Sequence, residues 1–553
     1  MSKVYVALVG ALLTLPLSGC LSDSSDGTSP VTADNPASNS PAGQELPSTD
    51  ISSDADAPTT SGPRLQPTTP SGIDRTCDEA PYPSKTWTTC ESRNFARTLE
   101  APAEQLDLAF QTRYSLQSTA NIAEWTARSL ADPSWLALRS GNSFLTPLCA
   151  SYGLPCTGDP YRYAGVSGPD GKQFFDQEAI IEDLVFYDRE CARISARLWL
   201  PRNATASNPV PGIVITNGSI QAPQTVYYWA AQALVRAGYG VMTYDPRGQG
   251  RSDMQTPRRG QGSNLNPRVF WEGQVDAIDF FRASPQRSYP HAQTCANTYR
   301  TRTANFNPFW DRIDHSRLGI AGHSLGAIGV SVVQGYGAEG AEPWPGILDQ
   351  DNPVTAAVGW DSLITPGAEG LATVANLQAP DELYTAITTL ITQDALPAFA
   401  PRVPSMSLFA DYAGVPVPYI APPDPTTNLA PFRAWQQANV PVYALGFQGT
   451  THFDFSQLPG FPSSSWCADT RKGACRGGWG SPAITYYTLA WFDRWLKKPG
   501  EPGYDDADQR LIDDAWEGGA MRMSYHYQSA RDFRDRLGDR QQCIDIRQGC
   551  AGE

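Results

Sequence analysis

The chain has 553 residues, of which 41% are hydrophobic, enough to build one large domain or two smaller ones around a substantial core. Its formal net charge of −15 at pH 7 argues against a nucleic-acid partner and against binding to anionic membranes by charge.

The first twenty residues read as a targeting segment. Lys3 supplies one positive charge, and the mostly apolar run 4–17 is too short for a stable transmembrane helix. The run ends in Leu17-Ser18-Gly19-Cys20, which resembles a bacterial lipoprotein signal, with an ordinary signal peptide and an incidental cysteine as the alternative. The resemblance implies a signal peptide over 1–20, lipidation of Cys20 and a lipid-anchored protein of the bacterial cell envelope. Leu21, in place of an Asp that retains lipoproteins at the inner membrane, favours the outer membrane.

Residues 21–75 are rich in Ser, Thr, Pro, Asp and Gly and contain few large apolar groups, which predicts a disordered tether. Residues 76–178 show stretches of helical periodicity without a catalytic motif, and we expect an N-terminal helical and loop subdomain there.

The cysteines suit an oxidising compartment. Besides Cys20 there are ten, an even number that favours disulfides, and the metal alternative is poor because no CxxC or His-rich spacing occurs. Sequence proximity predicts four local pairs and leaves one long-range pair; these are Cys77–Cys90, Cys149–Cys156, Cys467–Cys475, Cys543–Cys550 and Cys191–Cys295.

Residues 179–498 alternate strands and helices, which predicts an α/β domain with a mostly parallel central sheet covered on both faces. Two segments that alternate like antiparallel strands come first, at 181–187 and 192–201. The next expected strands are 211–216, 240–244, 318–322, 355–360, 405–410 and 440–446. The expected helices are 226–237, 269–282, 324–333 and 482–497, and residues 499–553 read as a polar C-terminal extension.

Ser324 lies in Gly322-His323-Ser324-Leu325-Gly326, which matches the G-x-S-x-G pattern of a nucleophile elbow. Such an elbow is a sharp turn from a strand into a helix, and its glycines provide steric clearance for a strained serine. Here the pattern follows an apolar strand and opens an Ala/Gly/Val-rich helix, so we predict that Ser324 is a nucleophile.

Together with two further motifs, this elbow makes residues 180–498 resemble the α/β-hydrolase family. Residues 213–219 resemble the family's first parallel strand and oxyanion loop. Asp245-Pro-Arg-Gly-Gln-Gly-Arg-Ser252 resembles its D-x-R-G-x-G-x-S turn, where we expect Asp245 and Arg247 to brace the core. The resemblance implies an α/β-hydrolase fold and a catalytic order of Ser, then acid, then His.

His452 is the predicted base, because it follows a late strand in Gly449-Thr-Thr-His452, where the family places its histidine. His526 is the other histidine after the nucleophile, and it lies beyond the last predicted helix of the domain.

Two aspartates compete for the role of the acid. Asp361 ends one strand and is followed five residues later by Pro366, which resembles the arrangement in platelet-activating-factor acetylhydrolases, as does Phe453-Asp-Phe after His452. Asp411 ends the next strand, but polyester hydrolases of this type place their acid about two residues further on, at Ala413. We favour Asp361 and keep Asp411 as the alternative.

The resemblance implies an oxyanion hole made of two backbone N–H groups, those of Leu325 and Ser219. We expect no cofactor and no metal. The acidic run 505–514 lacks the spacing of a calcium loop and reads as a solvated face.

The leading function hypothesis is an exported hydrolase of carboxylic esters that acts through an acyl-enzyme. Its substrate would be a small-molecule, lipid or polymeric ester, and its membrane partner would be reached through the N-terminal lipid. The alternatives are a serine peptidase or amidase on the same fold, and a non-catalytic binding protein.

Overall fold

The computed structural model describes residues 174–550 with internal gaps, together with the isolated residues Leu116 and Thr119. The gaps are 219–222, 254, 261, 263–265, 300–301, 368–395, 412–423, 448–449, 457–479, 517–519, 521–522 and 525. The predicted signal peptide, Cys20, the tether and nearly all of the predicted N-terminal subdomain therefore lie outside the described residues.

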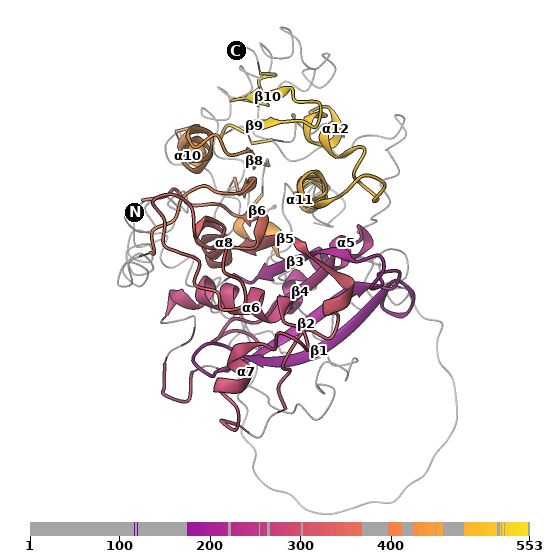
Figure 1. Cartoon of the computed structure of the whole chain (residues 1–553). Helices are drawn as coiled ribbons and strands as arrows, with labels where there is room; N and C mark the ends of the chain where they lie inside the picture. The colour runs from indigo at the N-terminus through magenta and orange to yellow at the C-terminus, as the bar shows by residue number, and fades with distance from the viewer. Residues whose placement is uncertain are drawn as a thin grey trace, which may run out of the picture.

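A ten-stranded sheet in the order β1-β2-β4-β3-β5-β6-β7-β8-β9-β10 organises the described residues (Figure 1). The strands are β1 Ala179–Tyr187, β2 Arg193–Pro201, β3 Val210–Thr216, β4 Gly240–Tyr244, β5 Ile313–His323, β6 Val354–Trp360, β7 Ser405–Phe409, β8 Val442–Gly446, β9 Ala530–Arg534 and β10 Arg540–Cys543. Neighbours are parallel from β4 through β8, and antiparallel pairs flank this centre on both sides. The predicted α/β architecture with a mostly parallel sheet is confirmed.

Helices cover both faces of the sheet (Figure 1). The α-helices are α5 Tyr228–Arg236, α6 Glu272–Arg282, α7 Pro290–Thr294, α8 Leu325–Gly335, α10 Ala430–Gln437, α11 Gly480–Leu496 and α12 Ala507–Ile512. Short π or 3-10 turns are η7 Phe174–Glu178, η8 Gln224–Tyr227, η9 Pro267–Phe270, η10 Trp310–Arg312, η12 Thr427–Leu429 and η13 His452–Phe455.

Two hydrophobic clusters lie on opposite faces of the sheet because strand side chains alternate in direction. In β3, Val214 belongs to the cluster that contains α6, α8 and α10, whereas Ile213 and Ile215 belong to the cluster that contains α5 and α11. A strand buried on both faces reads as a continuous apolar run, which is why β3 and β4 could be recognised in the sequence.

The segment after residue 498 contributes to the sheet, which the sequence did not indicate. Within it, β9 pairs with β8 and β10 pairs with β9, both antiparallel. Strand β9 reads Ala-Arg-Asp-Phe-Arg, and such charges are common where strands lie near a sheet edge. Among the acidic residues of 505–514, Asp508 pairs with Arg494 and Asp514 with Arg531, so part of this acidic run serves packing.

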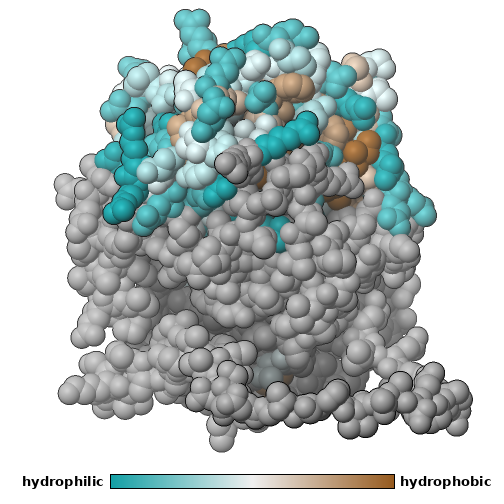
Figure 2. All heavy atoms as spheres, turned by 90° about the horizontal axis from the view of Figure 1, so that it is seen from below, coloured by the Kyte–Doolittle hydropathy of each residue, from teal (hydrophilic) through white to brown (hydrophobic). Residues whose placement is uncertain are grey.

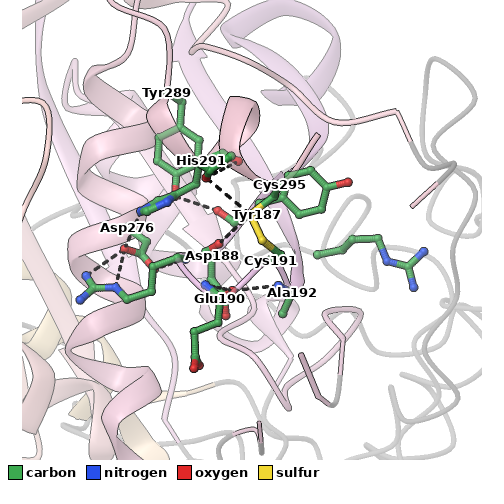
Figure 3. Close-up of a disulfide and its surroundings, with 12 residues drawn as sticks. Tyr187, Asp188, Glu190, Cys191, Ala192, Asp276, Tyr289, His291 and Cys295 are labelled. Carbon is green, nitrogen blue, oxygen red and sulfur yellow. Dashed lines mark hydrogen bonds and ion pairs between the residues drawn. A yellow bond between two sulfur atoms is a disulfide. The ribbon is translucent and has the colours of Figure 1, made fainter. Parts of the chain in front are cut away.

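Two disulfides are present in the described residues, and both were predicted. Cys543–Cys550 closes a short loop, and Cys191–Cys295 joins segments 104 residues apart. Figure 3 shows the long-range bridge beside Asp188, whose carboxylate accepts hydrogen bonds from the N–H groups of Glu190 and Ala192. Burial raises the pKa of Asp188 to about 7, although its ion pair with Arg247 opposes the shift. The other three predicted pairs lie outside the described residues.

Figure 2 shows the hydropathy of one face of the molecule. On the face seen in Figure 2, hydrophilic residues predominate among those described, with hydrophobic ones scattered between them. Within the same part of the chain, no helix combines the length and the apolar character that crossing a membrane requires.

Candidate active site

Ser324 is the single residue between strand β5 and helix α8. Its backbone angles are φ 57° and ψ −122°, a conformation that an L-residue rarely adopts and that a nucleophile elbow requires. Its N–H donates to the carbonyl oxygen of Trp360 at the end of β6, at 3.0 Å. The serine is partly exposed.

The two glycines of the elbow are sterically required. A Cβ atom on Gly322 would lie 2.3 Å from the carbonyl oxygen of Gly326, and one on Gly326 would lie 2.4 Å from that of Thr216. Real Cβ atoms essentially never make such contacts, so only glycine allows α8 to pack this closely against the end of β3.

The loop after β3 passes directly beside the nucleophile. A Cβ atom on Gly218 would lie 3.0 Å from the Cβ of Ser324. Ser219, one of the two predicted oxyanion donors, lies outside the described residues. Leu325, the other, is the first residue of α8, where backbone N–H groups have no intrahelical acceptor.

His452 and Asp361 are in direct contact. Nδ1 of His452 is hydrogen-bonded to Oδ2 of Asp361, and both side chains are about one-sixth exposed. The other carboxylate oxygen of Asp361 accepts from the N–H of Ala410 at 2.8 Å, and the Asp361 N–H donates to Leu408 at 2.7 Å. The end of β7 therefore holds Asp361 in place for His452.

Asp411, the alternative acid, has other bonds. It is buried, its carboxylate accepts from the Ser524 hydroxyl, and its N–H donates to the carbonyl oxygen of Thr450 at 3.1 Å. It thus ties the loop that precedes the base to the C-terminal segment.

The short helix η13 that carries His452 begins with a reciprocal cap. The Thr451 N–H and hydroxyl both donate to the buried carboxylate of Asp454, at 2.7 and 3.0 Å, and the Thr451 side chain in turn accepts from the Asp454 N–H. This arrangement orients the first residue of the turn, which is His452.

His323, at the first variable position of the elbow, packs against the ring of His452. Its ring centroid is 4.5 Å from that of His452, and it is 2% exposed. Burial, together with the neighbouring His452, holds the pKa of His323 well below its ordinary value, so the ring is neutral.

His323, Asp361 and His452 form the one cluster of possible metal-binding groups in the part of the chain that the structure describes, with one ligand atom of each within 4.8 Å of the others. Both nitrogens of His323 are engaged in hydrogen bonds, with Tyr227 and with a backbone carbonyl. A metal would have to break one of these bonds, and the cluster fits a proton-transfer site better.

The order of strands, the antiparallel β2 and the serine turn between β5 and α8 together identify the architecture. The fold is that of an α/β-hydrolase. No protein-family model and no curated protein matches the chain.

Solved structures with a similar arrangement include an esterase from the fungus Rhizomucor miehei, at 14% identity and a TM-score of 0.37, covering 68% of this chain and 89% of the esterase. The AtxE2 isopeptidase matches at 17% identity and a TM-score of 0.36, covering 64% of this chain and 45% of the isopeptidase. An acylaminoacyl peptidase from Pyrococcus horikoshii matches at 13% identity and a TM-score of 0.33, covering 61% and 44%. The chain thus spans less than half the length of the two peptidases. Such low similarity carries no inference about substrate.

Sequence reasoning missed the residues that support the site. Asp454 could have been found, because it stands three residues after Thr451 in the spacing of a capping box. The contacts of Tyr227 and Gln249 with Gly218 had no signal in the sequence, because they join residues from separate elements.

Proposed function

We propose that this protein is a serine hydrolase that cleaves carboxylic esters through an acyl-enzyme. Ser324 is the nucleophile, His452 the general base and acid, and Asp361 the carboxylate that orients the imidazole. The observation that carries the proposal is the hydrogen bond between His452 and Asp361, taken together with the elbow conformation of Ser324.

The tautomer of His452 follows from this bond. Since Nδ1 donates its proton to the Asp361 carboxylate, Nε2 of the neutral ring carries the lone pair. Nε2 takes the hydroxyl proton as Ser324 attacks the acyl carbon, and Asp361 stabilises the resulting imidazolium. The same proton then passes to the leaving alcohol. In the second half of the reaction, water attacks the acyl-enzyme while His452 takes its proton. His452 then returns this proton to Ser324, and the carboxylic acid is released.

The negative charge of each tetrahedral intermediate falls on the former carbonyl oxygen. We assign the Leu325 N–H, at the first position of α8, and the Ser219 N–H as its two donors. The N-terminus of α8 adds the positive end of a helix dipole at this place.

A substrate panel tests the choice of ester over amide. We expect purified protein to hydrolyse p-nitrophenyl esters of graded acyl length and to cleave peptide p-nitroanilides much more slowly, with both activities absent in Ser324→Ala. Faster cleavage of the anilides would replace the ester assignment by a peptidase. Activity that persists in Ser324→Ala would remove Ser324 from the mechanism.

We also propose that the enzyme acts outside the cytoplasm and is attached to the bacterial cell envelope through lipidated Cys20. The membrane that we propose for this anchor is the outer membrane. The sequence Leu-Ser-Gly-Cys20 and two disulfides in the described residues support this location. Growth with an alkyne-tagged fatty acid should label the wild type and not Cys20→Ser. Equal labelling of both would contradict the anchor.

A further inference from the structure

His323 joins two parts of the site that come from different elements. Its Nδ1 lies 2.8 Å from the hydroxyl of Tyr227, at the end of η8. Its Nε2 lies 2.8 Å from the carbonyl oxygen of His452, at the start of η13.

The direction of each hydrogen bond follows from the partners. A carbonyl oxygen only accepts, so Nε2 of His323 carries the proton and donates to His452. Nδ1 of the neutral ring must then accept, and Tyr227 donates its hydroxyl proton to it. The Tyr227 oxygen in turn accepts from the N–H of Gly218 at 2.9 Å.

Gly218 is held from both sides by buried side chains. While its N–H donates to Tyr227, its carbonyl oxygen accepts from Nε2 of Gln249 at 2.9 Å. Gln249 belongs to the turn after β4, where Asp245 accepts from the Asn217 side chain at 3.2 Å. Gly218, the residue before the predicted oxyanion donor Ser219, is thus held through both its N–H and its carbonyl oxygen.

We propose that Tyr227 and His323 are positioning residues. They fix the position of Gly218, in the oxyanion loop, relative to the base His452. The relay runs from the Gly218 N–H through the Tyr227 hydroxyl and the His323 ring to the His452 backbone. This inference rests on the proposed function, since it assigns a role within the same site.

The chemistry explains why a histidine occupies the first variable position of this elbow. The ring must accept on one side and donate on the other, and neutral imidazole does both from a rigid plane. Asn at this position can replace the Nδ1 acceptor but is too short for the His452 carbonyl. Gln can place an N–H near the Nε2 position but then gives up the acceptor toward Tyr227.

The test compares kcat, KM and thermal stability of Tyr227→Phe, His323→Asn and the double variant, with p-nitrophenyl ester as substrate. We expect each single variant to lower kcat by about 10- to 100-fold, because displaced donors and base stabilise the transition state less. KM should change far less than kcat. The double variant should lose little more than either single one, as members of one relay do.

Tyr289→Phe is the matched control, because its buried hydroxyl, like that of Tyr227, donates one hydrogen bond to a buried acceptor. For Tyr289 this acceptor is the carbonyl oxygen of Tyr187, at 2.7 Å, near the Cys191–Cys295 bridge (Figure 3). The control variant should lose stability as Tyr227→Phe does and keep its kcat.

Equal kcat in Tyr227→Phe and in the wild type would overturn the relay, as would equal kcat losses in Tyr227→Phe and Tyr289→Phe or fully additive losses in the double variant. A wild type without esterase or anilidase activity would instead reject the proposed function itself.

Discussion

Nδ1 of His452 is hydrogen-bonded to the carboxylate of Asp361, 91 residues earlier in the chain. Asp361 directly follows β6, the strand beside the one that leads into Ser324. Asp411, which follows β7, is bonded to Ser524 and Thr450. The candidate acid is therefore carried by the earlier of the two strands.

The two aspartates should respond differently to the same substitution. Asp361→Asn removes the charge that stabilises the imidazolium, and we expect kcat to fall by about 10⁴-fold with little change in stability. Asp411→Asn should keep kcat within about fivefold and lower the free energy of unfolding by about 1–3 kcal/mol, because it weakens a buried charged hydrogen bond. Ester kinetics and urea unfolding of both variants measure this. Reversed effects on kcat would make Asp411 the acid.

The packing of the elbow against β3 predicts a strong effect of one methyl group. Gly326→Ala would place its Cβ 2.4 Å from the Thr216 carbonyl oxygen, so α8 must shift and activity should fall at least about 100-fold. Gly273→Ala in α6 is the control, since its Cβ would meet nothing within 4 Å, and it should stabilise the protein by about 0.5–1 kcal/mol. Similar behaviour of the two variants would refute the steric account.

The two disulfides close loops of very different length. Loop-closure entropy predicts that Cys191→Ala/Cys295→Ala lowers stability by about 5 kcal/mol and Cys543→Ala/Cys550→Ala by about 2 kcal/mol, for separations of 104 and 7 residues. Chemical unfolding of both double variants tests the order. A larger loss from the short loop would show that loop length does not govern their contribution.

Buried His526 predicts acid sensitivity. Burial, with a smaller contribution from Arg547, lowers the pKa of His526 from its ordinary 6.5 to about 3 in the folded protein. Between these values the unfolded chain binds more protons, so stability falls as the pH drops from 6.5 toward 3. His526→Gln should reduce this slope by at most about 1.4 kcal/mol per pH unit. Unfolding curves recorded at several pH values check it, and parallel profiles for variant and wild type would contradict it.

Local patterns in the sequence predicted the centre of the fold well. Buried parallel strands are continuous apolar runs, so the bounds expected for 240–244 agree with those of β4 Gly240–Tyr244. Strands β9 and β10 were not recognised, because Ala-Arg-Asp-Phe-Arg and Arg-Gln-Gln-Cys carry little apolar alternation.

The residues of the candidate site also fall into two groups, those with a local signal in the sequence and those without one. Ser324 has a short motif with a steric cause. Asp361 could be favoured because its place after a strand, with Pro366 five residues later, resembles the arrangement in platelet-activating-factor acetylhydrolases. The contacts of His323 with Tyr227 and His452 depend on the mutual arrangement of β5, η8 and η13. No local pattern encodes that arrangement, so the supporting network required the structure.

The most direct test of the central proposal is covalent labelling of the nucleophile. Purified protein would be treated with a fluorophosphonate probe and digested, and the labelled residue would be mapped by mass spectrometry. Ser324→Ala would be treated in the same way, with Ser316→Ala, at an exposed serine, as the control. We predict one labelled residue, Ser324, in the wild type and in Ser316→Ala, and no label in Ser324→Ala. Label on another residue, or label that persists in Ser324→Ala, would contradict the assignment of Ser324 as nucleophile.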